Sequence, residues 1–240
     1  MFLLKYVFVR KILAFFLFIF VWNKSKRRSF RNYLLNSYGC NNKIIVTSKN
    51  GVKEYEYYHV RGLEVVFQGS NNILEISDST VFDGCVFYFC SNNSKIKIGK
   101  NSRFLSCRLA LRDGNYLTAE FGDRIISNGF KLDLVENFSS FSVGDDCLFS
   151  NSISIWCSDG HSIYEKGTKN RINTVKNSVK IGNHCWIGEG VRLTKNSQIP
   201  DNTIVGMGSL VTSSFSETHT IIAGNPAKVV KRNVDWSEEI

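Results

Sequence analysis

Apolar residues recur at every sixth position in the last third of the chain. The series has no gap: Ile181, Ile187, Leu193, Ile199, Val205 and Val211. A mostly small residue stands two positions before each of them. A helix repeats every 3.6 residues and a strand every 2, so neither alone gives this period. It is typical of the hexapeptide β-helix, in which three short strands form one coil of about 18 residues and stacked coils bury a continuous core.

The same unit occurs upstream with a longer step. Apolar pairs recur every 22 or 23 residues: Leu74/Ile76, Ile96/Ile98, Ala119/Phe121 and Phe141/Val143. The period of six then breaks at Cys157 and resumes at Val179, with a polar segment over 157–178 between them. We therefore expect a loop extruded from an otherwise regular solenoid, and such loops usually carry the function of repeat proteins.

These patterns predict an all-β fold: a left-handed parallel β-helix of hexapeptide repeats with an extruded loop, preceded by an N-terminal helix. The expected divisions are a hydrophobic and basic helical segment over 1–35, a linker and cap over 36–60, the β-helix over 61–215 with its loop at 157–178, and a C-terminal cap over 216–240.

The N-terminal segment combines an apolar run with many cations. Residues 12–22 are apolar, and Lys24, Lys26, Arg27, Arg28 and Arg31 follow them. About 20 apolar residues are needed to cross a bilayer, and no signal-peptide cleavage pattern is present. We expect residues 1–31 to lie on the cytoplasmic membrane surface, with the cations on anionic headgroups. The alternative is a helix that caps the open end of the fold.

The overall charge of +9 is confined to one end of the chain. The first 53 residues hold eleven Lys and Arg and no acid, which leaves a net charge of −2 for the rest (11 − 2 = 9). This distribution argues against nucleic-acid binding by the folded body. The seven cysteines include no C-x-x-C pair, so we expect neither a disulfide framework nor a metal site, and a reducing, cytoplasmic compartment.

Several stretches of the last hundred residues carry a family resemblance: SVGDDCLFSNSISIWCSDGHSIYE, VKIGNHCWIGEGVRL, IVGMGSLVT and IIAGNPAKVVKR. They resemble the hexapeptide-repeat acetyltransferases, most closely the O-acetyltransferases of capsular polysaccharide, polysialic acid and O-antigen. The resemblance is specific over 142–232, generic over 61–141 and absent from the first 50 residues. It implies a homotrimer with active sites between subunits, and acetyl transfer from acetyl-CoA to a sugar hydroxyl of a cell-surface polysaccharide.

The resemblance also assigns the catalytic residues. His161 matches the histidine that acts as general base, a role for which imidazole is suited by its unperturbed pKa of about 6.5. Asp159 or Glu165 would orient its ring, and the sequence leaves both open. Trp186 matches a functionally important tryptophan whose indole would wall the donor pocket and whose N–H would donate to a carbonyl or oxyanion.

The cofactor-binding residues are expected toward the C-terminus. Lys228 and Lys231 would meet the phosphates of acetyl-CoA as charge-assisted contacts, and Gly188, Gly206 and Thr212 complete the expected set. Similar enzymes often carry a lysine after the Val-Thr pair of this coil, where this chain has serine at position 213. A phosphate contact is therefore missing there or is supplied by another residue.

Two other functions remain open at this point. A related enzyme would acetylate the amino group of a nucleotide-linked sugar, using the same scaffold and the same donor. A non-catalytic β-helix would only scaffold or bind a glycan. The intact motif around His161 argues against the second alternative.

Overall fold

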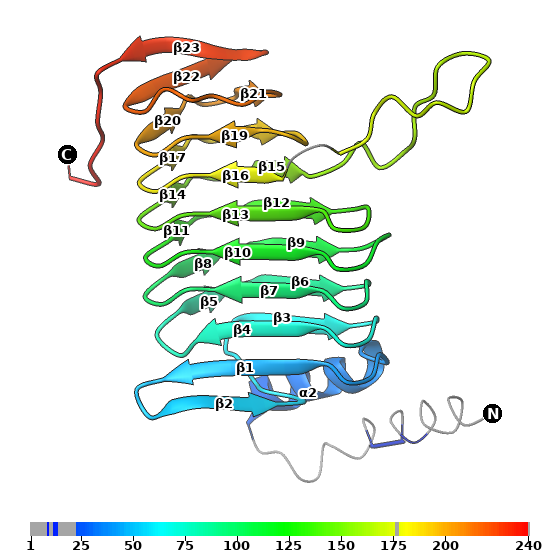
Figure 1. Cartoon of the computed structure of the whole chain (residues 1–240). Coiled ribbons are helices and arrows are strands. Elements are labelled where there is room, and N and C mark those ends of the chain that lie inside the picture. The colour runs from blue at the N-terminus through cyan, green and yellow to red at the C-terminus, as the bar shows by residue number, and fades with distance from the viewer. Residues whose placement is uncertain (1–8, 10–11, 14–22, 176–177, 240) are drawn as a thin grey trace.

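The computed structural model describes residues 9, 12–13, 23–175 and 178–239. They form a solenoid of stacked coils in which each coil contributes one strand to each of three sheets (Figure 1). Neighbouring coils pair in parallel, whereas the two terminal hairpins, β1–β2 and β22–β23, are antiparallel. The predicted all-β parallel β-helix with an extruded loop and a preceding helix is confirmed.

Three sheets run the length of the solenoid. Sheet 1 contains β1 (Lys43–Ser48), β2 (Gly51–Tyr55), β4 (Ile73–Ser77), β7 (Lys95–Ile98), β10 (Thr118–Phe121), β13 (Ser140–Val143), β16 (Val179–Ile181) and β19 (Gln198–Ile199). Sheet 2 contains β5 (Val81–Asp83), β8 (Arg103–Leu105), β11 (Ile126–Ser127), β14 (Leu148–Phe149), β17 (Trp186–Ile187), β20 (Thr203–Val205), β22 (Thr220–Gly224) and β23 (Ala227–Arg232). Sheet 3 contains β3 (Leu63–Phe67), β6 (Cys85–Phe89), β9 (Arg108–Leu111), β12 (Phe130–Leu134), β15 (Ile153–Trp156), β18 (Arg192–Leu193) and β21 (Leu210–Val211).

The six-residue series forms the inner wall of the upper coils. All six of its members are buried, and Ile187 pairs in register with Phe149 below and Val205 above. Phenylalanine side chains fill the core of the longer coils nearer the N-terminus. Phe104, Phe121 and Phe130 contact one another there, with ring centroids 5.5 to 6.3 Å apart. The hydrophobic period therefore sets the register as well as the burial.

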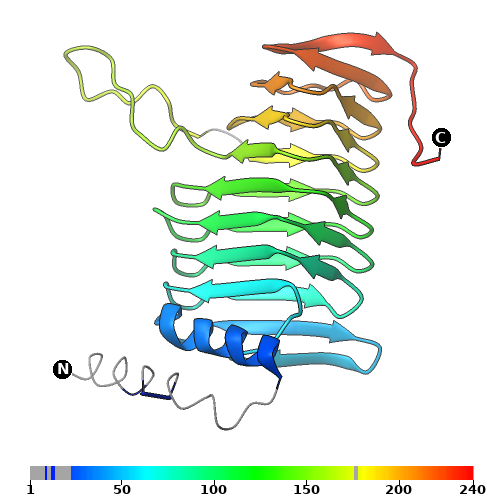
Figure 2. The same ribbon diagram turned by 180° about the vertical axis from the view of Figure 1, so that it is seen from behind.

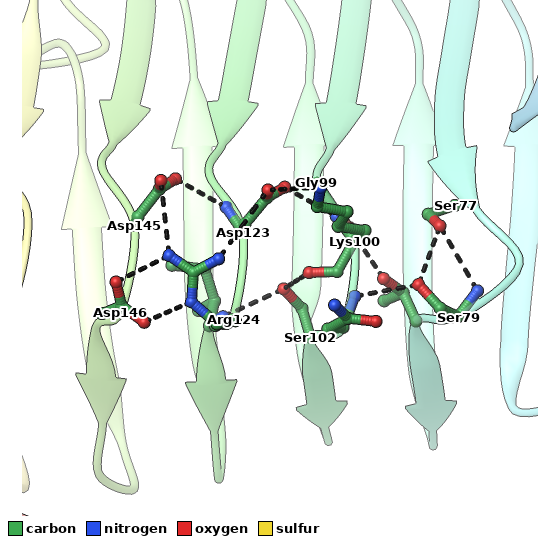
Figure 3. A network of polar contacts seen from close by, with 12 residues as sticks. Ser77, Ser79, Gly99, Lys100, Ser102, Asp123, Arg124, Asp145 and Asp146 are labelled. Atoms are coloured by element: carbon green, nitrogen blue, oxygen red, sulfur yellow. Dashed lines mark hydrogen bonds and ion pairs between the residues drawn. The ribbon is translucent and has the colours of Figure 1, made fainter.

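Side chains satisfy the backbone at the corners between sheets 1 and 2. The Asp123 carboxylate accepts from the Lys100 N–H at 2.9 Å, and Asp145 accepts from the Asp123 N–H at 2.8 Å (Figure 3). Asn183 continues this ladder at the next coil by accepting from the Asp145 N–H. Arg124 lies among these carboxylates and donates to Asp146 at 2.7 Å. The ladder gives partners to corner N–H groups that the strands leave unpaired.

Helix α2 (Lys24–Asn36) lies across the N-terminal end of the solenoid (Figure 2). Its rings of Phe30 and Tyr33 contact Tyr57, with centroids 4.8 and 4.9 Å away. Residues 24–36 thus cover this end of the solenoid, and the choice between a membrane-surface helix and a cap for the apolar run stays a prediction. Most of the apolar run 12–22 falls outside the described residues, and within these no helix is long and apolar enough to cross a bilayer.

The sheets extend beyond the range 61–215 expected for the β-helix. The range 36–60, expected to hold a linker and cap, contains β1, which pairs in parallel with β4 because Ile44 and Val46 alternate into the core. The range 216–240, expected to be a cap, contains β22 and β23, which continue sheet 2. Each end of the solenoid therefore finishes in a strand that is hydrogen-bonded to the sheet, β2 at one end and β23 at the other.

Candidate active site

The extruded loop leaves the solenoid after β15 and returns at β16, at the corner between sheets 3 and 1 (Figure 1). Its two arms are hydrogen-bonded to each other. The Ile172 N–H donates to the Ile163 carbonyl at 2.9 Å, and the Glu165 N–H donates to the Asn170 carbonyl at 3.0 Å. The loop is therefore an ordered hairpin that holds His161 near its base.

Asn173 links several residues at the base of this loop through its side-chain hydrogen bonds. Its amide donates to the His161 carbonyl at 2.7 Å and to the Asp159 carboxylate at 2.8 Å. Its side-chain oxygen accepts from the Ile163 N–H at 2.8 Å and from Arg171 at 3.0 Å. Only 7% of Asn173 is exposed. One buried amide thus holds the backbone of His161 and Ile163 and the side chain of Asp159.

The coils on either side clamp the loop. Glu136, from the coil below, accepts from Arg171 at 2.8 Å and from the Ser158 hydroxyl. The Arg171 guanidinium holds the pKa of Glu136 below its usual range, against the opposing effect of burial. Lys195, from the coil above, donates to the Asp159 carboxylate and to the Asn173 carbonyl. Sequence reasoning missed Glu136, Asn173 and Lys195.

The structure gives Asp159 a different contact from the one expected. Burial alone raises the pKa of Asp159, but hydrogen bonds from Lys195 and Asn173 outweigh it and hold that pKa below its usual range. Glu165 accepts from Asn170 at 3.1 Å near the tip of the loop. In the described part of the chain neither carboxylate is hydrogen-bonded to the His161 ring, which is exposed. Asp159 is therefore linked to the loop backbone through the Asn173 amide, which donates to both Asp159 and the His161 carbonyl.

Trp186 lies on another side of the same chain. It stands on β17 in sheet 2, is 38% exposed, and donates from its indole N–H to the Ser150 hydroxyl at 3.3 Å. The C-terminal residue Trp236 lies 6.1 Å from it, centroid to centroid, and stacks on His184. The loop and this C-terminal segment project on opposite sides of the solenoid (Figure 1). Within one chain, His161 and Trp186 are therefore not brought together.

Four of the five expected cofactor-binding residues border sheet 2. Gly188 and Gly206 form stacked corners after β17 and β20, where a side chain at Gly188 would meet the Val205 carbonyl oxygen at 2.7 Å. A side chain at Gly206 would meet Ala223, and Ala223 pairs with Lys228 across the final hairpin. Lys228 and Lys231 are exposed on β23. Thr212 is exposed at a different corner, the one that carries the loop.

Cysteines are packing residues in the body of the fold. Of the seven, five are buried, and Cys147 accepts from the Cys185 N–H at 3.3 Å. Over residues 23–175 and 178–239, no three histidine, cysteine, aspartate or glutamate side chains are grouped as metal ligands would be.

Comparison with known proteins identifies relatives of this chain, although no family model matches it. It is 31% identical over 193 residues to a polysialic acid O-acetyltransferase of Neisseria meningitidis, covering 72% of this chain and 89% of that enzyme. It is 29% identical over 142 residues to a polysialic acid O-acetyltransferase of Escherichia coli O1:K1, covering 59% of this chain and 44% of that longer enzyme.

Two solved structures resemble the fold. One is the polysialic-acid-specific acetyltransferase NeuO, with a TM-score of 0.66, 25% identity, and coverage of 85% of this chain and 88% of that one. The other is the polysialic acid O-acetyltransferase OatWY, with a TM-score of 0.53, 26% identity, and coverage of 76% of this chain and 93% of that one. The chain therefore belongs to the polysialic acid O-acetyltransferase family and is an acetyltransferase with the hexapeptide-repeat β-helix fold.

Proposed function

We propose that this acetyltransferase moves the acetyl group of acetyl-CoA to a hydroxyl of a capsular or other cell-surface polysaccharide, with polymers of sialic acid as the first candidates. The observation that carries the proposal is the ordered loop, whose buried Asn173 holds the His161 backbone in place. The names of the relatives support a sialic acid polymer as acceptor. They do not favour N-acetylation or a non-catalytic scaffold.

The chemistry follows from a histidine base at the foot of the extruded loop, where the Asn173 amide holds its backbone carbonyl. His161 removes the proton from the acceptor hydroxyl as its oxygen attacks the thioester carbonyl. The Trp186 indole N–H donates to the carbonyl oxygen as negative charge develops on it. When the tetrahedral species collapses, the C–S bond breaks and the imidazolium returns the proton to the departing thiolate. The products are the O-acetyl sugar and CoA.

A homotrimer would complete this site. Because the loop projects away from the side of its own chain that carries Trp186, a loop from one subunit would have to meet Trp186 of a neighbour (Figure 1). Lys228 and Lys231 on the final hairpin would then meet the phosphates of acetyl-CoA, close to the Gly206 corner. We expect the isolated subunit to be inactive for this reason.

Acetyl transfer to purified polysialic acid tests the proposal. The purified chain is incubated with acetyl-CoA and each acceptor, thiol release is followed, and the polymer is examined by mass spectrometry for acetyl groups. We expect acetylation of a hydroxyl of the polymer and none of a nucleotide-linked amino sugar. Acetylation of the amino sugar alone, or thiol release no faster than without protein for every polysaccharide offered, would overturn the proposed function.

A further inference from the structure

Two aromatic side chains stack on the surface directly below the extruded loop. The rings of Tyr116 and Phe138 lie 5.2 Å apart, centroid to centroid, and are within 8° of parallel. Both are exposed, Tyr116 by 52% and Phe138 by 72%. They come from consecutive coils at the corner between sheets 3 and 1, which is the corner that the loop replaces one coil higher. We call this pair the aromatic platform.

The platform occupies backbone positions that disfavour aromatic residues. Tyr116 and Phe138 have φ of 59° and 63°, in the left-handed region. The equivalent corner residues of the two coils below are Asn71 and Asn93, with φ of 58° and 55°. Asparagine tolerates this conformation, whereas a bulky side chain there is strained. Fold stability therefore does not account for two aromatic residues at these corners.

An asparagine ladder holds the platform in register. Asn137 accepts from the Asn115 N–H at 2.8 Å, and Asn115 accepts from the Asn92 N–H at 3.1 Å. The backbone N–H groups of Tyr116 and Phe138 each donate across the same corner to the coil below, at 3.0 Å. The strained positions are thus fixed by the surrounding hydrogen bonds, as is usual where strain serves a function.

The surroundings of the platform are those of a sugar-binding surface. Immediately after the two corners, the outer face of sheet 1 has a hollow of about 530 Å³ lined by Thr118, Glu120, Ser140, Phe141, Ser142, Ser178, Lys180 and Gln198. Hydroxyls, an amide and single charges of both signs suit the hydroxyl and carboxylate groups of a sugar. The exposed rings of the platform offer apolar surface beside them, as the C–H face of a pyranose requires.

The loop base adjoins this surface on its other side. Glu136, which clamps the loop through Arg171 and Ser158, stands two residues before Phe138. Ser140, two residues after Phe138, shares a hydrogen bond with Ser178 at the end of the loop. A glycan held on the platform would therefore lie beside the segment that carries His161.

We propose that Tyr116 and Phe138, together with the hollow on sheet 1, bind a sugar ring of the acceptor polysaccharide other than the one that is acetylated. This inference rests on the proposed function, because it takes the glycan acceptor as the occupant. The subsite favours chains long enough to occupy the catalytic loop and the platform at the same time. The competing occupant is a second copy of the chain.

The asparagine residues of the lower coils supply a variant that keeps the fold. Tyr116→Asn/Phe138→Asn removes both rings and restores the residue that the chain uses at Asn71 and Asn93, so its melting temperature should equal or exceed that of the native protein. With long-chain polysialic acid as probe, we expect KM to rise about tenfold while kcat and the KM for acetyl-CoA stay within about twofold. A sialic acid trimer should be acetylated equally by both proteins.

Two control variants isolate the effect. Tyr116→Phe/Phe138→Tyr keeps two stacked rings and should keep the native KM for the polymer. Tyr38→Asn removes an aromatic with the same 52% exposure as Tyr116, at the N-terminal end of the solenoid, and should change nothing. Light scattering of each variant reports the oligomeric state. A dissociated double-asparagine variant would show that the platform is a subunit contact and would overturn the proposal.

Affinity electrophoresis in gels that contain polysialic acid separates this proposal from the proposed function. Retardation of the native protein but not of the double variant supports the platform even where no acetylation occurs, a result that would overturn the proposed function alone. Acetylation by the native protein with an unchanged KM in the double variant would overturn the platform alone. Neither retardation nor acetylation of the native protein would overturn both.

Discussion

The side-chain amide of Asn173 donates to the backbone carbonyl of His161 across 2.7 Å, although the two residues are twelve positions apart. Asn173→Ala should remove the hydrogen bonds that this carbonyl and the Asp159 carboxylate accept from the amide, while Lys195 still donates to Asp159. We expect kcat to fall about tenfold or more, because the base then samples unproductive positions, with little change in the melting temperature. Asn170→Ala, which removes an amide contact at the tip of the loop, should leave kcat unchanged. Equal effects of the two variants would count against the positioning role.

His161→Ala should abolish the proton transfer while leaving the coils intact. The side chain is exposed on the loop, so its loss removes no core packing. We expect acetyl transfer to fall by at least about two orders of magnitude, with unchanged oligomeric state by light scattering. His219→Asn, at a corner of the C-terminal end with φ of 54°, is the matched control, because asparagine tolerates that backbone. Near-native turnover of His161→Ala would remove it from the mechanism.

The clamp of Glu136 on Arg171 should make the loop sensitive to acid. The pKa of Glu136 is lowered in the folded protein, so its stabilisation is present above the unfolded value of about 4.3 and is lost as pH falls through the folded value. Glu136→Gln mimics the protonated state at neutral pH. We expect trypsin to cleave this variant faster after Lys166, Lys169 or Arg171 than the native protein. Glu165→Gln, at the tip of the loop, should be cleaved at the native rate.

The register of the core can be tested at Ile187. This side chain is fully buried between Phe149 and Val205 of the neighbouring coils. Ile187→Asp places an unpaired charge in the stack and should prevent folding or assembly. Arg103→Asp, on an exposed position of the same sheet, should melt close to the native temperature. Circular dichroism compares the melting curves of the two variants. Coincident curves would contradict the assigned register.

The sequence predicted those features that repeat. The period of six marks the inward positions, because every coil repeats the same contact between apolar side chains. The break at Cys157 marks the loop for the same reason. The contacts that shape the site were not predictable, because Glu136, Asn173 and Lys195 meet from three different parts of the chain and none has a characteristic spacing.

The aromatic platform was missed for a related reason. Tyr116 and Phe138 look like ordinary aromatic residues until their backbone is known to be left-handed. A signal was nevertheless present in the chain. Asparagine occupies the equivalent corner at positions 71 and 93, and the step of 22 or 23 residues leads from these to the two aromatics. Aligning the coils with one another would have exposed the change of residue type.

Helix α2 at the N-terminal end packs on the solenoid through aromatic residues and also carries exposed cations. Phe30 and Tyr33 attach α2 to Tyr57. The cations Lys24, Lys26, Arg28 and Arg31 are all exposed. A trimer whose three-fold axis runs parallel to the solenoid axes would present three such helices at the same end. We propose that this end contacts the cytoplasmic face of the membrane, beside the machinery that makes or exports the polysaccharide.

Binding to vesicles of phosphatidylglycerol and phosphatidylcholine tests this contact. Each cation near an anionic surface is worth roughly 1 kcal/mol, so four cations and the apolar run at 12–22 should together pellet the protein at low salt. Raising the salt concentration should weaken pelleting, because it screens the cations.

Deletion of residues 1–22 keeps α2 and its aromatic contacts, and should reduce binding without lowering acetyl transfer to a soluble polymer. Replacing the four cations with serine in this deletion should abolish the remaining binding. Equal pelleting with pure phosphatidylcholine, or none with either vesicle, would leave α2 as a cap alone.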